Sequence, residues 1–350
     1  MEFDLIQRYF KQPFDALRVQ HAHTVPTGIG DDCAALQLPP EQRLYVSTDT
    51  LVGGVHFFED ENPEFIGWKA LACNVSDLAA SGAQALGFTL CLSIPTVDHA
   101  WLHGFSKGLL ACAEQFACPL VGGDTTGSGR NTQASITIGV MGYAPNTHSG
   151  FHRACAAVGD TVWVSGVPGL ARLGLLLQYQ ARGLRQSPCD FLNQLPESIR
   201  TQAQQALLKP HPRLQLGLAL RGMAHAAVDL SDGLSGDLGH VAKASGVQLC
   251  IEQPMLMQLW IRLWPELAHP SRAPLLRWLC EVSCVGGDDF ELCWTAPSQA
   301  TPAIRALTAD CELTAIGSVQ QGQGVCLHNG MGQSTTLNAR SFDHFSEEPT

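Results

Sequence analysis

Hydrophobic and polar positions along the chain follow the periods of strands and helices in turn. Residues 87–94 and 135–141 alternate with the two-residue period of strands, and residues 98–117 show the spacing of a helix. The other expected strands are 44–46, 118–121, 161–165, 226–230, 247–251, 291–295 and 314–318, and the other expected helices are 2–10, 64–73, 169–180, 232–245 and a short one near 303. This alternation predicts mixed α/β domains.

The segment 145–150 reads Pro-Asn-Thr-His-Ser-Gly and is the best candidate for a linker. A chain of 350 residues is long enough for two hydrophobic cores, so we expect domains at 1–145 and 146–350. The first residues lack the basic and apolar regions of a signal peptide, and no apolar run reaches membrane-spanning length. We therefore expect a cytoplasmic protein.

Acidic turns recur along the chain, and most of them follow a short apolar run. They are Gly28-Ile29-Gly30-Asp31-Asp32, Ser47-Thr48-Asp49, Ser76-Asp77, Gly122-Gly123-Asp124, Asp229-Leu230-Ser231-Asp232 and Gly286-Gly287-Asp288-Asp289. A single Asp in such a turn is explained by helix capping or by turn formation. A set of this kind favours one site assembled from several strand ends.

The net negative charge of the chain and the carboxylates of the site limit the ligands that such a site can bind. The formal net charge of −11 disfavours nucleic acid or an anionic membrane as the main partner. Converging carboxylates repel one another unless a hard cation neutralises them, and Mg²⁺ prefers oxygen ligands and bridges to phosphates. The candidate ligands are Asp32, Asp49, Asp77, Asp124, Asp229 and Asp232, with Ser47 and Thr48 as further oxygen donors. Asp77 and Asp232 precede helical patterns, so helix capping stays open for both, and Asp31 is expected to bond backbone in its turn.

Other residues suit phosphate binding. The pairs Gly122-Gly123 and Gly286-Gly287 allow backbone N–H groups to face a phosphate, although a plain turn explains them too. Arg153 is a candidate phosphate partner or a solvated surface residue, and His56 either contacts a substrate phosphate or packs in a core. The chain has no P-loop, protein-kinase or Gly-x-Ser-x-Gly motif.

The 13 cysteines form no Cys-x-x-Cys pair. Cys280 and Cys284 lie one helical turn apart, with no nearby His pair to complete a zinc site. We interpret the cysteines as reduced thiols that mostly pack as small hydrophobic residues, and favour this over reactive or metal-binding cysteines.

Taken together, the acidic turns resemble the thiamine-monophosphate kinase family, over nearly the whole chain and in order. The resemblance extends to Val55-His56-Phe57, to the segment 69–80 and to Phe342-Asp343-His344-Phe345. It implies a two-domain α/β fold like that of aminoimidazole ribonucleotide synthetase, and a homodimer that pairs through the N-terminal domain. It also implies phosphorylation of thiamine monophosphate by ATP, the final step of thiamine diphosphate synthesis, with several Mg²⁺ ions. Whether K⁺ is also needed stays open.

The resemblance assigns roles by position. The metal ligands would be Asp32, Ser47, Thr48, Asp49, Asp77, Asp124, Asp229 and Asp232. ATP would contact Gly123, Asp124, Arg153 and Ser231, and thiamine monophosphate would contact His56, Asp288 and Phe342. Asp288 stands where the family has Glu, and the loop at 166–169 lacks the family's Gly-Asp step.

No catalytic nucleophile is expected, because phosphoryl transfer needs positioning and charge neutralisation, and the attacking group would be the substrate's own phosphate. Two alternatives stay open. One is another ATP-dependent enzyme of the same superfamily, acting like a purine-pathway synthetase. The other is a non-catalytic homologue that binds nucleotide and metal.

Overall fold

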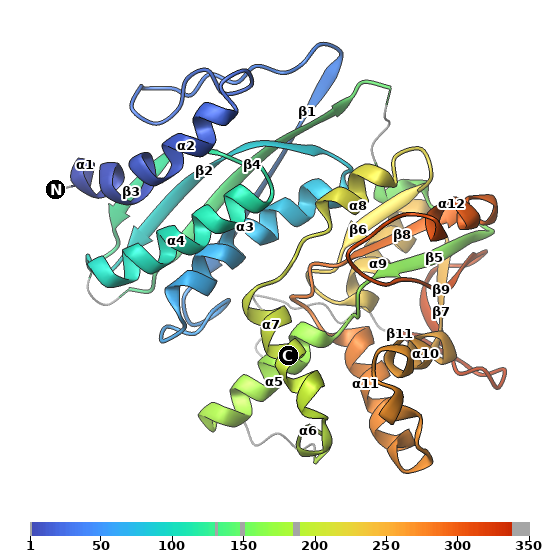
Figure 1. The fold of residues 1–350 in the computed structure, drawn as a ribbon. Coiled ribbons are helices and arrows are strands. Elements are labelled where there is room, and N and C mark those ends of the chain that lie inside the picture. The colour runs from blue at the N-terminus through green and yellow to red at the C-terminus, as the bar shows by residue number, and fades with distance from the viewer. Residues whose placement is uncertain (1, 130–131, 148–150, 185–189, 338–350) are drawn as a thin grey trace. The chain divides into compact units, whose positions relative to one another are not determined.

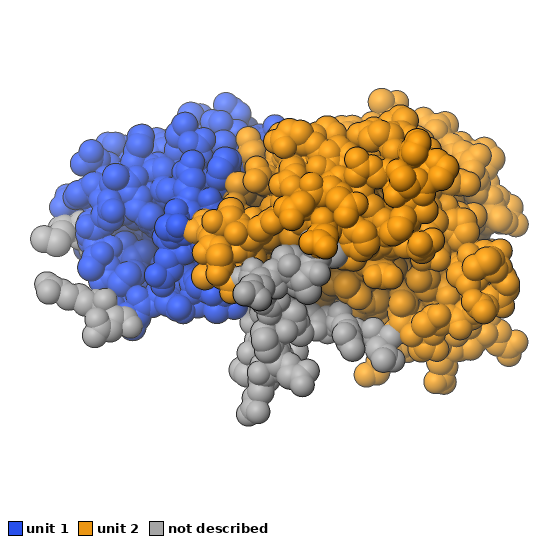
Figure 2. Space-filling view, turned by 90° about the horizontal axis from the view of Figure 1, so that it is seen from below, with its two compact units in different colours: residues 1–150 blue, residues 151–350 orange. Residues whose placement is uncertain are grey.

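The structure is a computed structural model that describes residues 2–129, 132–147, 151–184 and 190–337. The chain forms two compact units, residues 1–150 and 151–350 (Figure 2). Residues 1–150 are called unit 1, and residues 151–350 are called unit 2. Among the described residues no helix is long and apolar enough to cross a membrane, and the cysteines form no disulfide.

Unit 1 is built on a four-stranded sheet in the order β1-β4-β2-β3. The strands are β1 Gln42–Val52, β2 Gln84–Ile94, β3 Leu120–Gly127 and β4 Ser135–Pro145. β4 pairs antiparallel with β1 and β2, whereas β3 runs parallel to β2. The helices are α1 Glu2–Leu5, the π-helix Ile6–Lys11, α2 Gln12–Gln20, α3 Pro63–Ala80 and α4 His99–Gln115.

The long helices α3 and α4 lie side by side along the sheet (Figure 1). Each starts at a side-chain cap: Asn62 accepts the N–H of Glu64, and Asp98 accepts those of Ala100 and Trp101. Their backbones nearly touch, because an added Cβ at Gly108 would collide with the carbonyl oxygen of Glu64.

Two of the expected strand limits in unit 1 were wrong. The strand expected at 44–46 continues to Val52, and the strand expected at 118–121 begins at Leu120 and continues to Gly127. Ser47–Asp49 and Gly122–Asp124 therefore lie within strands rather than beyond strand ends. The reason is pairing: β4 offers partners along the whole of β1, and β2 offers partners to residues 122–127 of β3.

Unit 2 is built on a seven-stranded sheet in the order β11-β10-β7-β9-β5-β8-β6. The strands are β5 Asp160–Ser165, β6 Ala226–Asp229, β7 Gln248–Glu252, β8 Leu292–Pro297, β9 Leu313–Gln320, β10 Gly324–His328 and β11 Ser334–Leu337. β10 and β7 are parallel, and the other pairs are antiparallel.

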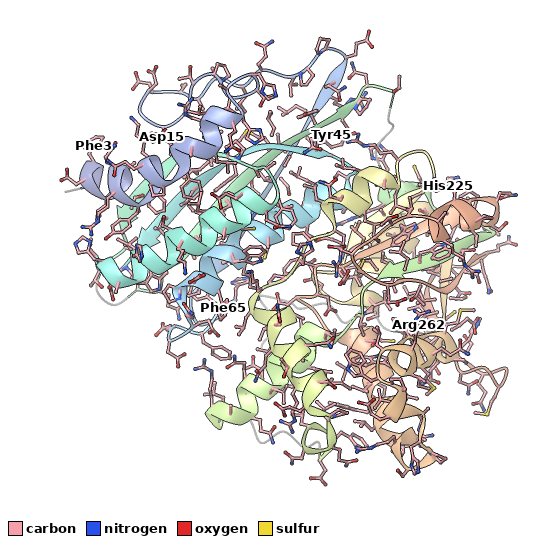
Figure 3. The ribbon with its side chains drawn as sticks, viewed as in Figure 1. Phe3, Asp15, Tyr45, Phe65, His225 and Arg262 are labelled. Atoms are coloured by element: carbon pink, nitrogen blue, oxygen red, sulfur yellow. The ribbon has the colours of Figure 1, made fainter. Side chains whose placement is uncertain are left out.

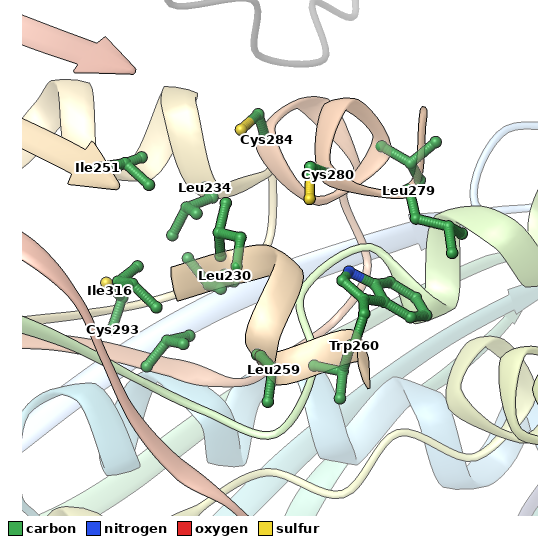
Figure 4. Packing of buried hydrophobic residues seen from close by; sticks show 14 of the residues in the cluster. Leu230, Leu234, Ile251, Leu259, Trp260, Leu279, Cys280, Cys284, Cys293 and Ile316 are labelled. Carbon is green, nitrogen blue, oxygen red and sulfur yellow. The ribbon is translucent and has the colours of Figure 1, made fainter. Parts of the chain in front are cut away.

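The hydrophobic core of unit 2 lies between this sheet and its helices (Figure 4). The helices are α5 Leu170–Arg182, α6 Phe191–Gln194, α7 Glu197–Leu208, α8 Leu214–Ala219, α9 Leu234–Ser245, α10 Gln253–Leu263, α11 Ala273–Val285 and α12 Thr301–Arg305. Leu230 within the acidic turn and Leu234 just after it pack into this core, which anchors the turn between β6 and α9.

Candidate functional site

In unit 1, three predicted ligands meet between β1 and α3. Ser47 lies on β1, two residues after Tyr45, which is labelled in Figure 3. The Oγ of Ser47 donates a 2.6 Å hydrogen bond to Oδ2 of Asp77. Asp49 lies two residues further along the strand, so its side chain points to the same face of the sheet. Its backbone N–H donates to Oδ1 of Asn74, one helical turn before Asp77 on α3.

The two carboxylates are close enough to oppose each other's ionisation. Burial, the charge of Asp77 and a hydrogen bond with Asp77 together raise the pKa of Asp49 to about 6. A cation between the two groups would remove this penalty, and their oxygens are ligands that Mg²⁺ prefers. Asp77 lies inside α3 and bonds a strand residue, so the capping alternative for Asp77 was wrong.

The sheet register separates two other predicted ligands, Thr48 and Asp124, from Asp49. Asp49 aligns with Ile138, and Ile138 with Leu90. Thr48 points to the opposite face from Ser47 and Asp49 and is exposed. Asp124 is exposed and aligns with the exposed Cys91 instead.

Asp32 lies in a loop before β1. It is exposed, and its N–H donates to Oδ1 of Asp31, which is the backbone contact expected of Asp31. Within unit 1 the described contacts therefore bring together Ser47, Asp49 and Asp77. Asp32 and Asp124 lie outside this group of three.

The structure has no room for a side chain at Gly123, which the sequence did not indicate. An added Cβ would collide with the carbonyl oxygen of Leu90 on the neighbouring strand, at a φ of 154°. The neighbouring Gly122 has open space instead. Gly123 therefore permits close approach of two strand backbones.

His56 holds the turn that follows β1. Its Nδ1 accepts the backbone N–H of Val52 at 3.0 Å, so in this tautomer Nε2 carries the proton. The buried Lys69 on α3 donates to the carbonyl oxygen of His56 at 3.4 Å. The ring is thus positioned by the end of β1 and by α3.

In unit 2, hydrogen bonds join the turn after β6 to the segment before β8. The N–H of Asp288 donates to the carbonyl oxygen of Ser231, and that of Phe290 to the carbonyl oxygen of Leu230, both at 2.8 Å. The strands themselves pair with Asp229 opposite Leu292. Two predicted motifs that lie 55 residues apart in the sequence (Ser231 and Gly286) therefore form one surface.

Close approach explains the glycines of this surface. An added Cβ at Gly233, where φ is 110°, would press on the carbonyl oxygen of Gly286. Asp288 itself has a left-handed backbone with φ of 68°, a conformation in which Asp is enriched among the non-glycine residues.

Asp237 also belongs to this group, although it was not among the predicted site residues. Its Oδ2 accepts the N–H groups of Asp232 and Gly233 at 3.1 and 3.0 Å. Burial and the charges of Asp229 and Asp232 together raise the pKa of Asp237 to about 8, against the lowering effect of its two backbone hydrogen bonds. An acidic residue in the first helical turn that reaches back to the turn's N–H groups is the signal that could have identified it.

Asp237 also decides the capping question for Asp232. Helix α9 begins at Leu234 after Gly233, so Asp232 precedes the cap position, and Asp237 satisfies the backbone donors there. The capping alternative for Asp232 was therefore wrong. The acidic group of unit 2 contains Asp229, Asp232 and Asp237.

Asp289 and Glu291, which follow Asp288, form hydrogen bonds with distant parts of unit 2. The buried Asp289 accepts the N–H groups of Gly169 and Ala171 at the start of α5, and burial raises its pKa well above the usual value. Glu291 forms two hydrogen bonds with Arg213, of 2.6 and 2.7 Å, and its charge raises the pKa of that guanidinium against the opposing effect of burial.

Comparison with known proteins identifies the family of this chain. Residues 30–144 match the model for "AIR synthase related protein, N-terminal domain". Thiamine-monophosphate kinase of Salmonella typhimurium is 38% identical over 99% of this chain and 98% of its own length. The chain belongs to the thiamine-monophosphate kinase family.

Solved structures of that family have the same fold. Thiamine-monophosphate kinase from Stenotrophomonas maltophilia K279a is 36% identical, with a TM-score of 0.74 over 89% of this chain and 94% of its own. A structure described as "AaThiL complexed with AMPPCP and TMP" is 26% identical, with a TM-score of 0.69 over 95% of both chains. The α/β, aminoimidazole ribonucleotide synthetase-like fold expected from the resemblance is thereby confirmed.

Of the residues that the thiamine-monophosphate kinase resemblance assigns, Arg153 lies apart from these contacts. Arg153 is exposed, and its carbonyl oxygen accepts a hydrogen bond from Ser245 at the last residue of α9, whereas Asp232 precedes the first. Helix α9 has 12 residues, so its ends lie roughly 18 Å apart. Phe342 lies outside the described residues.

Proposed function

We propose that this protein transfers the terminal phosphoryl group of ATP directly to thiamine monophosphate, forming thiamine diphosphate and ADP. The observation that carries the proposal is the 38% identity to a thiamine-monophosphate kinase over 99% of this chain. A related structure described as containing AMPPCP and TMP supports the choice of nucleotide and acceptor.

Magnesium fits the acidic groups of both units. The ligands in this proposal are Asp32, Ser47, Thr48, Asp49, Asp77, Asp124, Asp229 and Asp232. The raised pKa of Asp49 supports it, because this carboxyl is costly to ionise beside Asp77 without a cation. Mg²⁺ supplies charge neutralisation between carboxylates and phosphates. The chain's own task is to hold these oxygens in fixed positions.

The substrates need positioning rather than a protein nucleophile. Gly123, Asp124, Arg153 and Ser231 contact ATP in this proposal, and His56, Asp288 and Phe342 contact thiamine monophosphate. His56 suits this role because the end of β1 fixes its Nδ1, which sets the direction of the opposite ring edge. The acceptor phosphate is already an anion at neutral pH, so no strong general base is required.

We further propose a cytoplasmic homodimer in which residues 1–145 carry the dimer contact and the ATP and metal site, and residues 146–350 complete the ATP and substrate site. The open face of the four-stranded sheet supports the dimer. Leu44 and Val46 on the edge strand β1 are 46% and 64% exposed, and they align with Tyr143 and Met141 on β4. Apolar side chains on one sheet face indicate a protein partner.

A coupled assay tests the activity. Purified protein with ATP and Mg²⁺ should convert thiamine monophosphate to thiamine diphosphate, and ADP should form in equal amount. The assay is repeated with added K⁺ and with a panel of purine-pathway acceptors. No thiamine diphosphate under any of these conditions would contradict the proposal, and ATP binding without turnover of any acceptor would favour a non-catalytic homologue.

Light scattering coupled to size exclusion tests the dimer. The unchanged protein should elute at twice the mass of one chain. Val46→Glu places a charge on the open sheet face and should shift the protein towards monomer, whereas the same change at the exposed Val158 in unit 2 should not.

A further inference from the structure

Strands β7 and β10 in unit 2 carry two thiols, an imidazole and a carboxylate on one face. The strands are parallel neighbours, with Cys326 aligned to Cys250 and His328 aligned to Glu252. Residues two apart on a strand share a face, so all four side chains project to the same side. The alternate residues of β7, Leu249 and Ile251, belong to the hydrophobic core instead.

The distances within this group are close to those of a metal centre. Ligand atoms of Cys250, Cys326 and His328 all lie within 4.8 Å of one another. Sγ of Cys326 is 3.5 Å from Nε2 of His328. Tetrahedral Zn²⁺ with ordinary bond lengths places sulfur and nitrogen ligands roughly 3.5 Å apart.

The two sulfur atoms are closer than a bound ion would leave them. They lie 2.7 Å apart, and tetrahedral Zn²⁺ separates two thiolates by roughly 3.8 Å. A cysteine side-chain rotation that parts them by roughly 1 Å opens room for the ion between three ligands.

Glu252 gives His328 the orientation of a metal ligand. Its Oε1 lies 3.0 Å from Nδ1 of His328. A carboxylate on Nδ1 fixes the tautomer and leaves Nε2 as an acceptor directed at the sulfur atoms, as in carboxylate–histidine–zinc groups. Cysteines that only packed as small hydrophobic residues would not require this arrangement.

The burial of the two thiols suits metal binding better than nucleophilic reactivity. Both cysteines are buried, while the side chains of His328 and Glu252 are 29% and 30% exposed, which leaves a route for an ion. Buried cysteines are inert as nucleophiles, and metal binding releases the protons of the thiols that it uses.

We propose that Cys250, Cys326 and His328 bind Zn²⁺ or a similar thiophilic cation, with Glu252 orienting the imidazole. Each coordinated thiol releases its proton to solvent, and the fourth coordination position stays open. This site differs in chemistry from the proposed magnesium site, because sulfur and imidazole select softer metals than carboxylates do. The proposal does not depend on the kinase activity.

Cobalt titration tests the site. Reduced, EDTA-treated protein is titrated with Co²⁺ in the presence of excess Mg²⁺, which occupies oxygen-ligand sites. We expect a thiolate-to-cobalt charge-transfer band that saturates at one equivalent and disappears when Zn²⁺ is added. Cobalt held by carboxylates alone would give no such band, so the readout identifies sulfur ligands.

Variants assign the ligands. Cys326→Ser and His328→Asn should abolish or strongly weaken the band, and Cys155→Ser, which removes an exposed thiol in the same unit, should keep it. Glu252→Gln should weaken binding by about 10–100-fold, and this partly exposed position tolerates the change without unfolding. No band in the unchanged protein, a band unaffected by Cys326→Ser, or a metal-free Cys250–Cys326 disulfide found by mass spectrometry would each overturn the proposal.

Discussion

The hydroxyl of Ser47 donates to the carboxylate of Asp77, which joins the middle of an edge strand to the last turns of helix α3. This bond places Asp77 beside Asp49. The acidic character of the site in unit 1 therefore depends on how β1 packs against α3.

Asp77→Ala should lower kcat/KM on the order of 10²–10³-fold, because a preorganised group that stabilises charge in the transition state is lost. Asp98→Ala is the matched control, since Asp98 caps α4. It should cost about 1 kcal/mol of stability and leave turnover close to that of the unchanged protein. Steady-state kinetics and urea unfolding measure both, and full activity of Asp77→Ala would refute its role as a metal ligand.

Two variants of Asp237 should distinguish its hydrogen bonds to the backbone from the effect of its charge on metal binding. Asp237→Ala leaves two N–H groups without their acceptor and should lower the free energy of unfolding by about 1–3 kcal/mol. Asp237→Asn keeps an oxygen for both and should unfold close to the unchanged protein. It should nevertheless raise the Mg²⁺ concentration needed for half-maximal turnover. Equal stabilities of the two variants would contradict this division.

Gly123→Ala should destabilise the protein by about 1–3 kcal/mol, because the added methyl group overpacks against the backbone of Leu90. Gly122→Ala is the matched change next door, where open space is present. It should leave stability unchanged or raise it by about 0.5–1 kcal/mol. Thermal unfolding of both variants provides the comparison, and equal effects would show that the close approach of β2 and β3 does not limit this position.

Asp289 should make stability depend on pH. Its folded pKa is raised above the ordinary value by burial, so the folded state binds the proton more tightly than the unfolded state. Its contribution is therefore full below the ordinary Asp pKa and is lost as the pH rises through the folded value. The free energy of unfolding of the unchanged protein minus that of Asp289→Asn should fall as the pH rises from acid, and a difference that is constant with pH would be inconsistent with this assignment.

Removal of one partner of the Arg213–Glu291 ion pair should strongly lower the free energy of unfolding. Their side chains are only 12% and 11% exposed. Arg213→Met leaves a buried, unpaired carboxylate and should cost about 3–5 kcal/mol. The double variant Arg213→Met/Glu291→Leu should cost less than the sum of the two single variants, as measured in a double-mutant cycle by urea unfolding. Additive effects would show that the two groups do not interact energetically.

The sequence by itself determined the fold class, the family and the order of most strands and helices, because local hydrophobic period and motif order are properties of the chain alone. It also predicted Asp49, Asp77 and the turn from Asp229 to Asp232, which the structure places in two acidic groups. It did not predict Asp237 or the supporting contacts of Asp289 and Glu291, since each depends on a partner distant in sequence or on a helix boundary.

Strand limits and side-chain direction needed the tertiary structure. Ser47–Asp49 and Gly122–Asp124 read as turns beyond strand ends, yet they lie within strands, because pairing partners on β4 and β2 extend the ladders. The same pairing decides which face each residue points to, and so joins Asp49 to Asp77 while turning Thr48 away. Likewise, only the alignment of β7 with β10 brings Cys250 to Cys326 and His328, because residues 76 positions apart meet through hydrogen bonds between strands and not through any pattern along the chain.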